Sequence, residues 1–338
     1  MINGSKQRVV GSGLKMIANA PEIPRVGKFD VFIMRRQFYR AFRAVGALNV
    51  ILRAMPNLKS FMFEPWHGIS QERCERQDLQ HQELFEYLFA HEKLKKVVIF
   101  KNFEERMSHG YSRGSQSLPV PGEFLGRILA ESSRATVTSL RLSYITDVMY
   151  FFRAFSRNLD SGRDLPDLLP LEEMRWNNPR TLVLISDELR EDDDHDVLIQ
   201  ILAGTAKNMP RISLLEIWNS GNGHGAYIRY TRELGNTSPP KLTLGSTWGL
   251  NLSHDVLKLW NEVAEVYQCR HALKIAYDEF DAKKVKSYST FADPKVAINS
   301  SLRDAARYAK PAVLIRKGVS EQLQIMPLGS IPIFVVIS

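Results

Sequence analysis

The sequence lacks the features of secreted and membrane proteins. Its 338 residues include only two cysteines, Cys74 and Cys269, too few for a disulfide framework in a chain of this size. The N-terminal segment has no apolar core of signal-peptide length, and no run approaches the roughly 20 apolar residues of a transmembrane helix. We therefore expect an intracellular protein, cytoplasmic or nuclear, with no membrane partner.

Long basic runs are also missing, although the net charge is +8. The 45 Lys and Arg residues are interspersed with 37 Asp and Glu, a pattern more typical of a solvated surface than of a nucleic-acid-binding tract. Arg36, Arg40 and Arg43 fall on one face of a predicted helix, where an arginine-rich outer face is the simpler interpretation. Nucleic acid therefore stays an open but less favoured partner.

Patterns for catalysis and metal binding are incomplete. Gly110-Tyr-Ser-Arg-Gly114 has the spacing of a nucleophile elbow, but the strand and helix that this motif requires do not flank it. Gly221-Asn-Gly-His-Gly225 follows a strand, yet a phosphate-binding loop opens a helix, and the next residues alternate as in a strand. The acids of Glu191–Asp196 suit a helix start, with Asp196 as the N-cap. We expect no catalytic residue, no metal site and no cofactor.

What the sequence does contain is a repeated unit. Six segments pair a helix-patterned stretch with a short alternating apolar run, and the runs centre on Phe61, Val97, Leu140, Leu182, Leu215 and Leu273. Two units echo each other, since 53–68 and 207–221 both read Met-Pro, then alternating apolar residues, then Trp. Proline disfavours helical conformation in the residue before it, so each Met-Pro pair is predicted to end a helix.

Polar residues such as Arg141 and Glu216 interrupt these runs, which predicts a sheet with one face open to water. A doubly wound sheet is the main alternative, but its strands are covered on both faces and read as near-continuous apolar runs. We therefore expect an α/β fold, an irregular leucine-rich-repeat-like solenoid with a parallel sheet on the concave side and helices on the convex side. A β-hairpin is expected as an insertion near residues 226–248.

Several phrases of the sequence resemble a family of uncharacterised fungal proteins. They are MPNLKSFMFEPW after Arg35-Arg36-Gln37, then IWNSGNG, AYIRYTRE and TWGLNLSHDVLKLWNEVA. Members often carry an F-box-like segment ahead of an irregular leucine-rich-repeat-like body, and their function is unknown. No F-box-like segment precedes Pro21, so we expect this chain to correspond to the C-terminal part of that architecture. The resemblance implies a single domain over residues 21–318, after a poorly ordered segment 1–20 and before a tail, 319–338, of unassigned structure.

These features predict a non-catalytic scaffold that presents the open face of its sheet to a protein partner. The resemblance implies, more specifically, the substrate-reading part of an F-box-like protein, here without the F-box. Strand alternation assigns to that face Met62, Glu64, Val98, Phe100, Arg141, Ser143, Glu216, Trp218 and Lys274. Among these residues Trp218 is expected to be an exposed binding anchor. Two alternatives remain: an enzyme whose site is built from loops 108–122 and 221–225, and a basic nucleic-acid-binding protein.

Overall fold

The computed structural model describes residues 30–34, 45–65, 71–100, 123–153, 175–191, 195–220, 224–235, 238–269 and 271–284, with two short strands near the C-terminus. The main strands are β1 Val31–Met34, β2 Ser60–Phe63, β3 Lys96–Phe100, β4 Ser139–Ser143, β5 Thr181–Ile185, β6 Leu214–Ser220, β7 Gly225–Thr231, β8 Lys241–Ser246 and β9 Lys274–Glu279. The helices are α3 Val45–Arg53, α4 Gln71–Phe89, α5 Glu123–Ser133, α6 Val148–Arg153, α8 His195–Lys207 and α9 His254–Val266, with a short 3-10 helix, η2, at Ala282–Lys284. The two short strands, β10 Met326–Leu328 and β11 Ile331–Ile333, pair with each other in antiparallel fashion.

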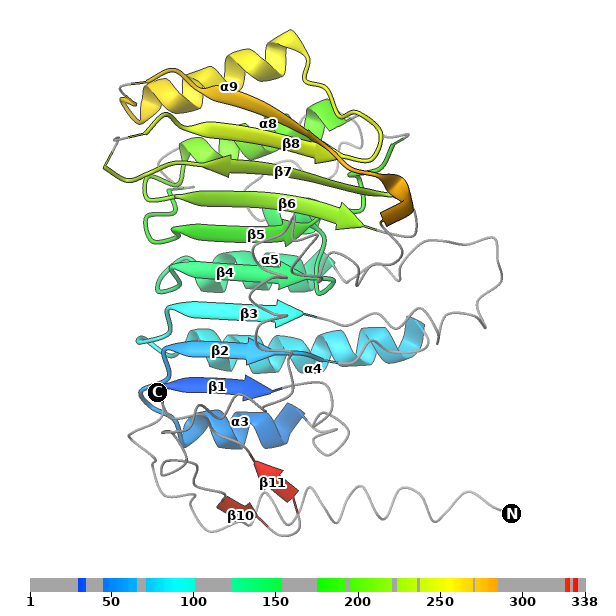
Figure 1. The fold of residues 1–338 in the computed structure, drawn as a ribbon. Coiled ribbons are helices and arrows are strands. Elements are labelled where there is room, and N and C mark those ends of the chain that lie inside the picture. Colours follow the sequence, from blue (N-terminus) through cyan, green and yellow to red (C-terminus); the bar gives the residue numbers. More distant parts are fainter. Residues whose placement is uncertain are drawn as a thin grey trace, which may run out of the picture.

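The nine main strands form one sheet in which chain order and spatial order are the same, from β1 at one edge to β9 at the other (Figure 1). All pairs are parallel except β6 with β7 and β7 with β8, which are antiparallel. Each parallel step requires a crossover, and a helix lies between the two strands of every parallel pair. The predicted α/β class and the inserted hairpin are confirmed, with β7 and β8 as the two arms of the hairpin.

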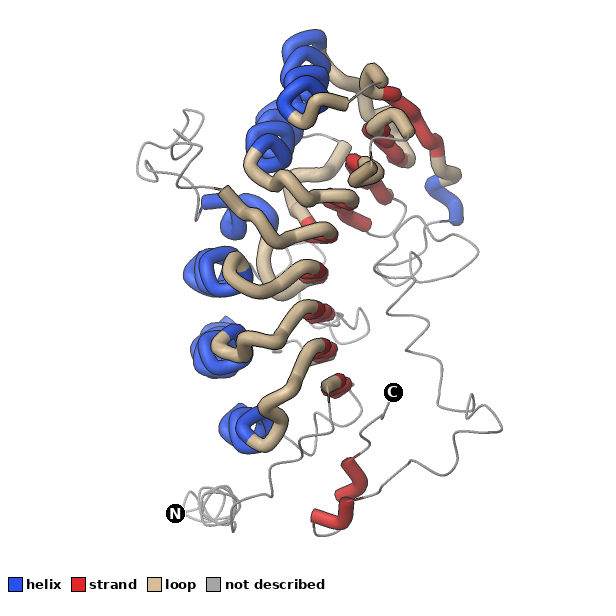
Figure 2. Tube along the Cα trace, turned by 90° about the vertical axis from the view of Figure 1, so that its left-hand side faces the viewer, coloured by secondary structure: helices blue, strands red, loops and turns tan. Residues whose placement is uncertain are grey.

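The six α-helices among the described residues all lie on one face of the sheet (Figure 2). Strand side chains alternate between the two faces, so Leu140 and Leu142 of β4 are buried against the helices while Arg141 points to the other face. On α5, Leu125 and Leu129 are buried one turn apart, and Arg127 pairs with Glu131 on the exposed side. Burial of one such leucine contributes about 1.5–3 kcal/mol, and the main core repeats this arrangement along the sheet.

The two Met-Pro pairs form the same turn between a helix and a strand. Met55 N–H donates to the Leu52 carbonyl, and Leu58 N–H then donates to the Met55 carbonyl at 3.1 Å. In the other unit, Met209 N–H donates to the Ala206 carbonyl, and Ile212 N–H donates to the Met209 carbonyl at 2.9 Å. Both methionine side chains are buried. The echo in the sequence is therefore a packing requirement of the turn, as predicted.

Two details differ from the sequence-based expectation. β1 was not predicted, because four apolar residues with no helix-patterned stretch before them carry too little periodicity to be recognised. α8 begins at His195, so Asp196 lies in its first turn and is not the N-cap, although an acid there still interacts favourably with the helix dipole. The predictions for residues 1–20, for Arg36, Arg40 and Arg43, and for the loop 108–122 lie outside the described residues.

No helix in the described part of the chain is both long enough and apolar enough to cross a lipid bilayer.

Candidate binding surface on the helix-free face

Strand register places the predicted binding residues together on the sheet face opposite the α-helices, which we term the helix-free face. Met62, Val98 and Arg141 pair in sequence across β2, β3 and β4, and the same row continues through Val183 to Glu216. Two residues further along their strands, Phe100 pairs with Ser143 and Ile185 with Trp218. Lys274 lies in the row of paired residues that contains Leu214, two positions before the row of Glu216. Glu64 directly follows β2.

The helix-free face is far less exposed than the sequence suggested. Trp218 and Glu216 are both 0% exposed, so the expectation of a tryptophan anchor open to solvent is wrong. Met62, Val98 and Ser143 are also buried. Glu64, Phe100 and Arg141 are half-buried, and Lys274 is exposed. The role of these nine residues in binding stays a prediction. Only the half-buried and exposed ones, Glu64, Phe100, Arg141 and Lys274, can contact a partner directly.

A second apolar cluster buries the centre of this face. It consists of Tyr144, Val183, Ile185, Trp218 and Tyr227, with Phe100, Leu214 and Phe280 packed against it. The Tyr144 ring meets the Trp218 ring edge-on with centroids 5.5 Å apart, and Phe280 stacks on Tyr227 at 5.7 Å. Tyr144 directly follows β4, and Phe280 directly follows β9. Strand alternation does not predict the orientation of a residue that lies beyond the end of a strand, so the sequence did not reveal that these two residues cover the face.

Tyr144 reaches its place through an unusual backbone conformation. Its φ is +57°, a left-handed value that a residue with a Cβ seldom adopts, and it comes directly after Ser143 at the end of β4. With this conformation the chain turns sharply after β4, and the Tyr144 ring packs against the helix-free face of the sheet. No letter pattern in the sequence signals such a conformation when the residue is neither glycine nor asparagine.

Gly245 of β8 makes room for the same cluster. A Cβ at this position would lie 2.4 Å from Cε1 of Tyr227 and 2.5 Å from Cζ of Phe280. Real Cβ atoms do not approach carbon this closely, so glycine is the residue that allows the two rings to stack over β8.

An ion pair lies beside this cluster. Glu216 and Arg229 are direct neighbours on β6 and β7, and Nε of Arg229 donates to Oε2 of Glu216 at 2.5 Å. The guanidinium of Arg229 also lies over the Tyr227 ring, 4.7 Å from its centroid. Among the described residues, the second carboxylate oxygen, Oε1, has no hydrogen-bond partner.

Burial raises the pKa of Glu216, while the charges of Arg229 and Arg141 act in the opposite direction. A second polar contact joins β7 to β9, where the Tyr227 hydroxyl donates to Oδ2 of Asp278. Burial and this hydrogen bond raise the pKa of Tyr227. These contacts thus link β6 to β7 and β7 to β9 on this face.

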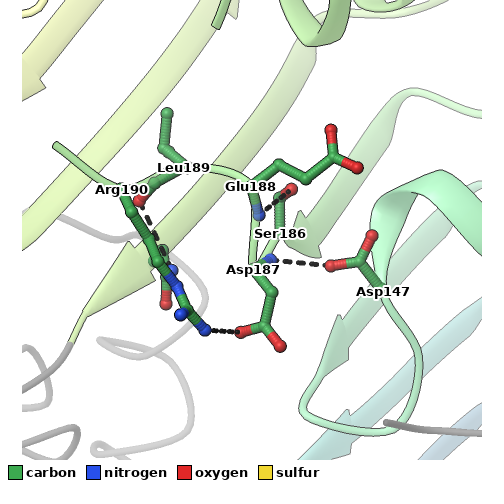
Figure 3. A network of polar contacts seen from close by, with 7 residues as sticks. Asp147, Ser186, Asp187, Glu188, Leu189 and Arg190 are labelled. Carbon is green, nitrogen blue, oxygen red and sulfur yellow. Dashed lines mark hydrogen bonds and ion pairs between the residues drawn. The ribbon is translucent and has the colours of Figure 1, made fainter. Parts of the chain in front are cut away.

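A separate polar network lies where β4 and β5 end (Figure 3). Asp147 accepts hydrogen bonds from the backbone N–H of Met149 and of Asp187, both at 2.7 Å, and so joins the start of α6 to the turn after β5. In that turn the Ser186 hydroxyl accepts from the N–H of Glu188, and Arg190 pairs with Asp187. Burial raises the pKa of Asp147 to about 6. The network fixes two loops, and within the described residues no His, Cys, Asp and Glu side chains gather in a group that could hold a metal ion.

The motifs considered for chemistry are placed only in part. Gly110–Gly114 lies outside the described residues, as do positions 192–194 of the acidic stretch and 221–223 of the glycine-rich turn. Gly225, the last residue of that turn, begins strand β7 and not a helix. The glycine-rich turn therefore lacks the helix N-terminus that a phosphate-binding loop requires.

Comparison with curated proteins finds no match, and comparison with solved structures finds none either. The sequence does match a family of unknown function, DUF6546, over residues 89–299. The matched stretch runs from the end of α4 past η2 and includes β3 to β9. It therefore contains most of the helix-free face, from Val98 to Lys274. Since the match extends over more than half of the 338 residues, the chain belongs to the family of unknown function DUF6546.

Proposed function

We propose that this protein is a non-catalytic protein-interaction scaffold of the leucine-rich-repeat type. In this proposal the sheet is the concave side and the helices the convex side of an irregular solenoid. The observation that carries it is the strictly consecutive order of the nine main strands, with the described α-helices all on one face and the other face free of them (Figures 1 and 2). Solenoids of stacked helix–strand units commonly bind partners on such a surface.

The accessible part of the helix-free face has a composition suited to protein recognition. Half-buried Phe100 and Arg141 border the aromatic cluster, and exposed Lys274 lies at the far edge. Aromatic and arginine side chains surrounded by polar groups are typical of interface centres. The buried cluster beneath them supports the proposal in another way, because it makes the surface rigid and lowers the entropy lost on binding.

A pair of charge-matched variants tests the proposal. Glu64→Arg with Ala276→Arg changes the helix-free face, and Glu83→Arg with Asn261→Arg changes exposed positions of α4 and α9. We expect the first variant to lose the proteins that co-purify with the wild-type chain, quantified by mass spectrometry, and the second to keep them. If both variants retain the same proteins in the same amounts, the helix-free face is not the binding surface.

The resemblance to fungal F-box-like proteins supports a narrower version of this proposal. The scaffold would then be the substrate-reading part of an F-box-like protein. A co-purifying protein whose abundance in cells rises when the chain is deleted would support this version. Partners whose abundance does not change would leave a scaffold without a role in degradation.

A further inference from the structure

Among the described residues, charge is divided between the two edges of the sheet. The loops that lead into the parallel strands, the first residues of those strands, and the turn between β7 and β8 form one edge, which we term the basic edge. Its basic residues are Lys59, Lys93, Lys95, Lys96, Arg134, Arg175, Arg180, Arg211, Arg232, Lys241 and Lys274, and of these Arg232 is buried. The acids among its described residues are Asp30, Glu92 and Glu233. This is the left-hand edge in Figure 1, where β1 to β6 begin.

The opposite edge has the reverse charge. Where the parallel strands end, the described residues include Glu64, Asp147, Asp187, Glu188, Glu191, Asp278, Glu279 and Asp281. Arg190, Lys283 and Lys284 are the basic residues there. The charged side chains of the described residues are thus not spread evenly between the two edges. The sequence conceals this division because residues far apart in the chain meet at one edge.

A ladder of backbone hydrogen bonds holds the basic edge in a regular row. Lys95 N–H donates to the Lys59 carbonyl at 2.8 Å, Thr138 N–H to the Lys95 carbonyl, and Arg180 N–H to the Thr138 carbonyl at 2.7 Å. Lys95 directly precedes β3 and Arg180 directly precedes β5. Neighbouring strands lie about 4.8 Å apart, so these two residues are roughly 10 Å from each other. Cations at such fixed intervals give a continuous positive potential along the edge.

Neutral groups hold several of these cations in position. Nζ of Lys95 donates to the Thr136 carbonyl at 3.2 Å, and Nζ of Lys93 donates to the side-chain oxygen of Asn57. Such contacts orient an ammonium group and leave its net charge in place. Lys59 differs, because it pairs with Asp30 at 3.2 Å. Lys95, Arg180, Lys241 and Lys274 are all exposed.

We propose that the basic edge binds an acidic segment of the protein partner, an inference that rests on the proposed scaffold function. Charge complementarity selects an acidic ligand, and two features favour protein over nucleic acid. Leu234, beside Glu233, is 47% exposed and offers an apolar contact, and the basic edge offers no exposed Phe, Tyr or Trp ring among its described residues on which bases could stack.

The test compares two charge-matched triple variants of the full chain. The first variant, Lys95→Glu with Arg180→Glu and Lys241→Glu, reverses the charge at three places on the basic edge. The second, Arg76→Glu with Arg127→Glu and Lys258→Glu, reverses the charge at exposed positions on three helices. The probe is a fluorescein-labelled oligoglutamate peptide, followed by fluorescence anisotropy. Single-stranded and duplex DNA of equal total charge serve as comparison probes.

We expect the basic-edge variant to bind oligoglutamate at least about tenfold more weakly than wild type, and the helix variant to stay within about twofold. Equal weakening by both triple variants would overturn the proposal, because only net charge would then matter. Tighter binding of either DNA than of oligoglutamate would also overturn it, in favour of a nucleic-acid interface. Should the glutamate variant unfold, as circular dichroism would show, the corresponding glutamine substitutions are expected to weaken binding about threefold or more and are judged by the same criteria.

A cellular experiment separates failure of this inference from failure of the proposed function. A protein retained by the basic-edge variant and lost by Glu64→Arg with Ala276→Arg would refute the basic edge and leave the scaffold function standing.

Discussion

Nε of Arg229 lies 2.5 Å from Oε2 of Glu216, across the antiparallel pair β6 and β7, and the glutamate is completely buried. We predict that Arg229→Met lowers the free energy of unfolding by about 3–5 kcal/mol, because it leaves a buried carboxylate without its main counter-charge. The double variant Arg229→Met with Glu216→Gln should recover part of this loss. Urea denaturation of the single and double variants measures the coupling.

The same pair predicts a dependence on pH. Burial already raises the pKa of Glu216, and loss of Arg229 would raise it further. A carboxyl group whose pKa is higher in the folded state binds more protons when folded, so the Arg229→Met protein should lose stability as pH rises above about 4.3, the ordinary value for glutamate. As a control, Lys207→Met removes the partner of Glu262 on the surface, and it should have a far smaller effect on stability at every pH. A similar loss in both variants would contradict the importance of burial.

Asp147 gives a second pH prediction. Its pKa rises from 3.8 to about 6 in the folded state, so its contribution to stability is fully present below pH 3.8 and is lost as pH rises through about 6. That difference corresponds to about 3 kcal/mol at most. Asp147→Asn keeps an oxygen that can accept from the Met149 N–H and does not titrate. The wild-type protein should therefore lose stability relative to this variant between pH 4 and pH 7; a constant difference would contradict the assignment.

Gly245→Ala tests the stacking of Tyr227 and Phe280 over β8. The new methyl group would meet both rings, and we expect a loss of about 1–3 kcal/mol from overpacking. Gly249→Ala is the control, because a Cβ there has no neighbour within 4 Å and its φ of +83° costs only about 1–2 kcal/mol of backbone strain. In the Phe280→Ala background, the cost of Gly245→Ala should shrink and the cost of Gly249→Ala should stay the same. Thermal unfolding of wild type, the three single variants and the two double variants distinguishes crowding from strain.

Periodicity in the sequence predicted most of the fold. The six alternating runs became β2, β3, β4, β5, β6 and β9, and the 226–248 segment became the hairpin of β7 and β8. Helix ends were also readable where Met55 and Met209 precede proline. These features depend on neighbours within a few residues, so local letters suffice to predict them.

The candidate site was only partly predictable, because its cover comes from outside the strands. Alternation placed Glu216 and Trp218 on the correct face, but it could not foresee that Tyr144 and Phe280 bury that face. The joint at Asp147 was missed for a similar reason, since its partners are the backbone N–H groups of Met149 and Asp187 and no side-chain pattern reports them. The charge division appears only when strand register brings distant lysines and arginines to one edge.

Photo-crosslinking tests the central claim, protein binding on the helix-free face, most directly. Benzoylphenylalanine replaces Phe100, which borders the aromatic cluster, or Phe124, which is 55% exposed on α5, so each exchange is of one aromatic residue for another. After irradiation in cells, we predict discrete protein adducts from position 100 that vanish when Glu64→Arg and Ala276→Arg are also present, and none in comparable yield from position 124. Adducts of equal yield from both positions, or from position 124 alone, would contradict the account.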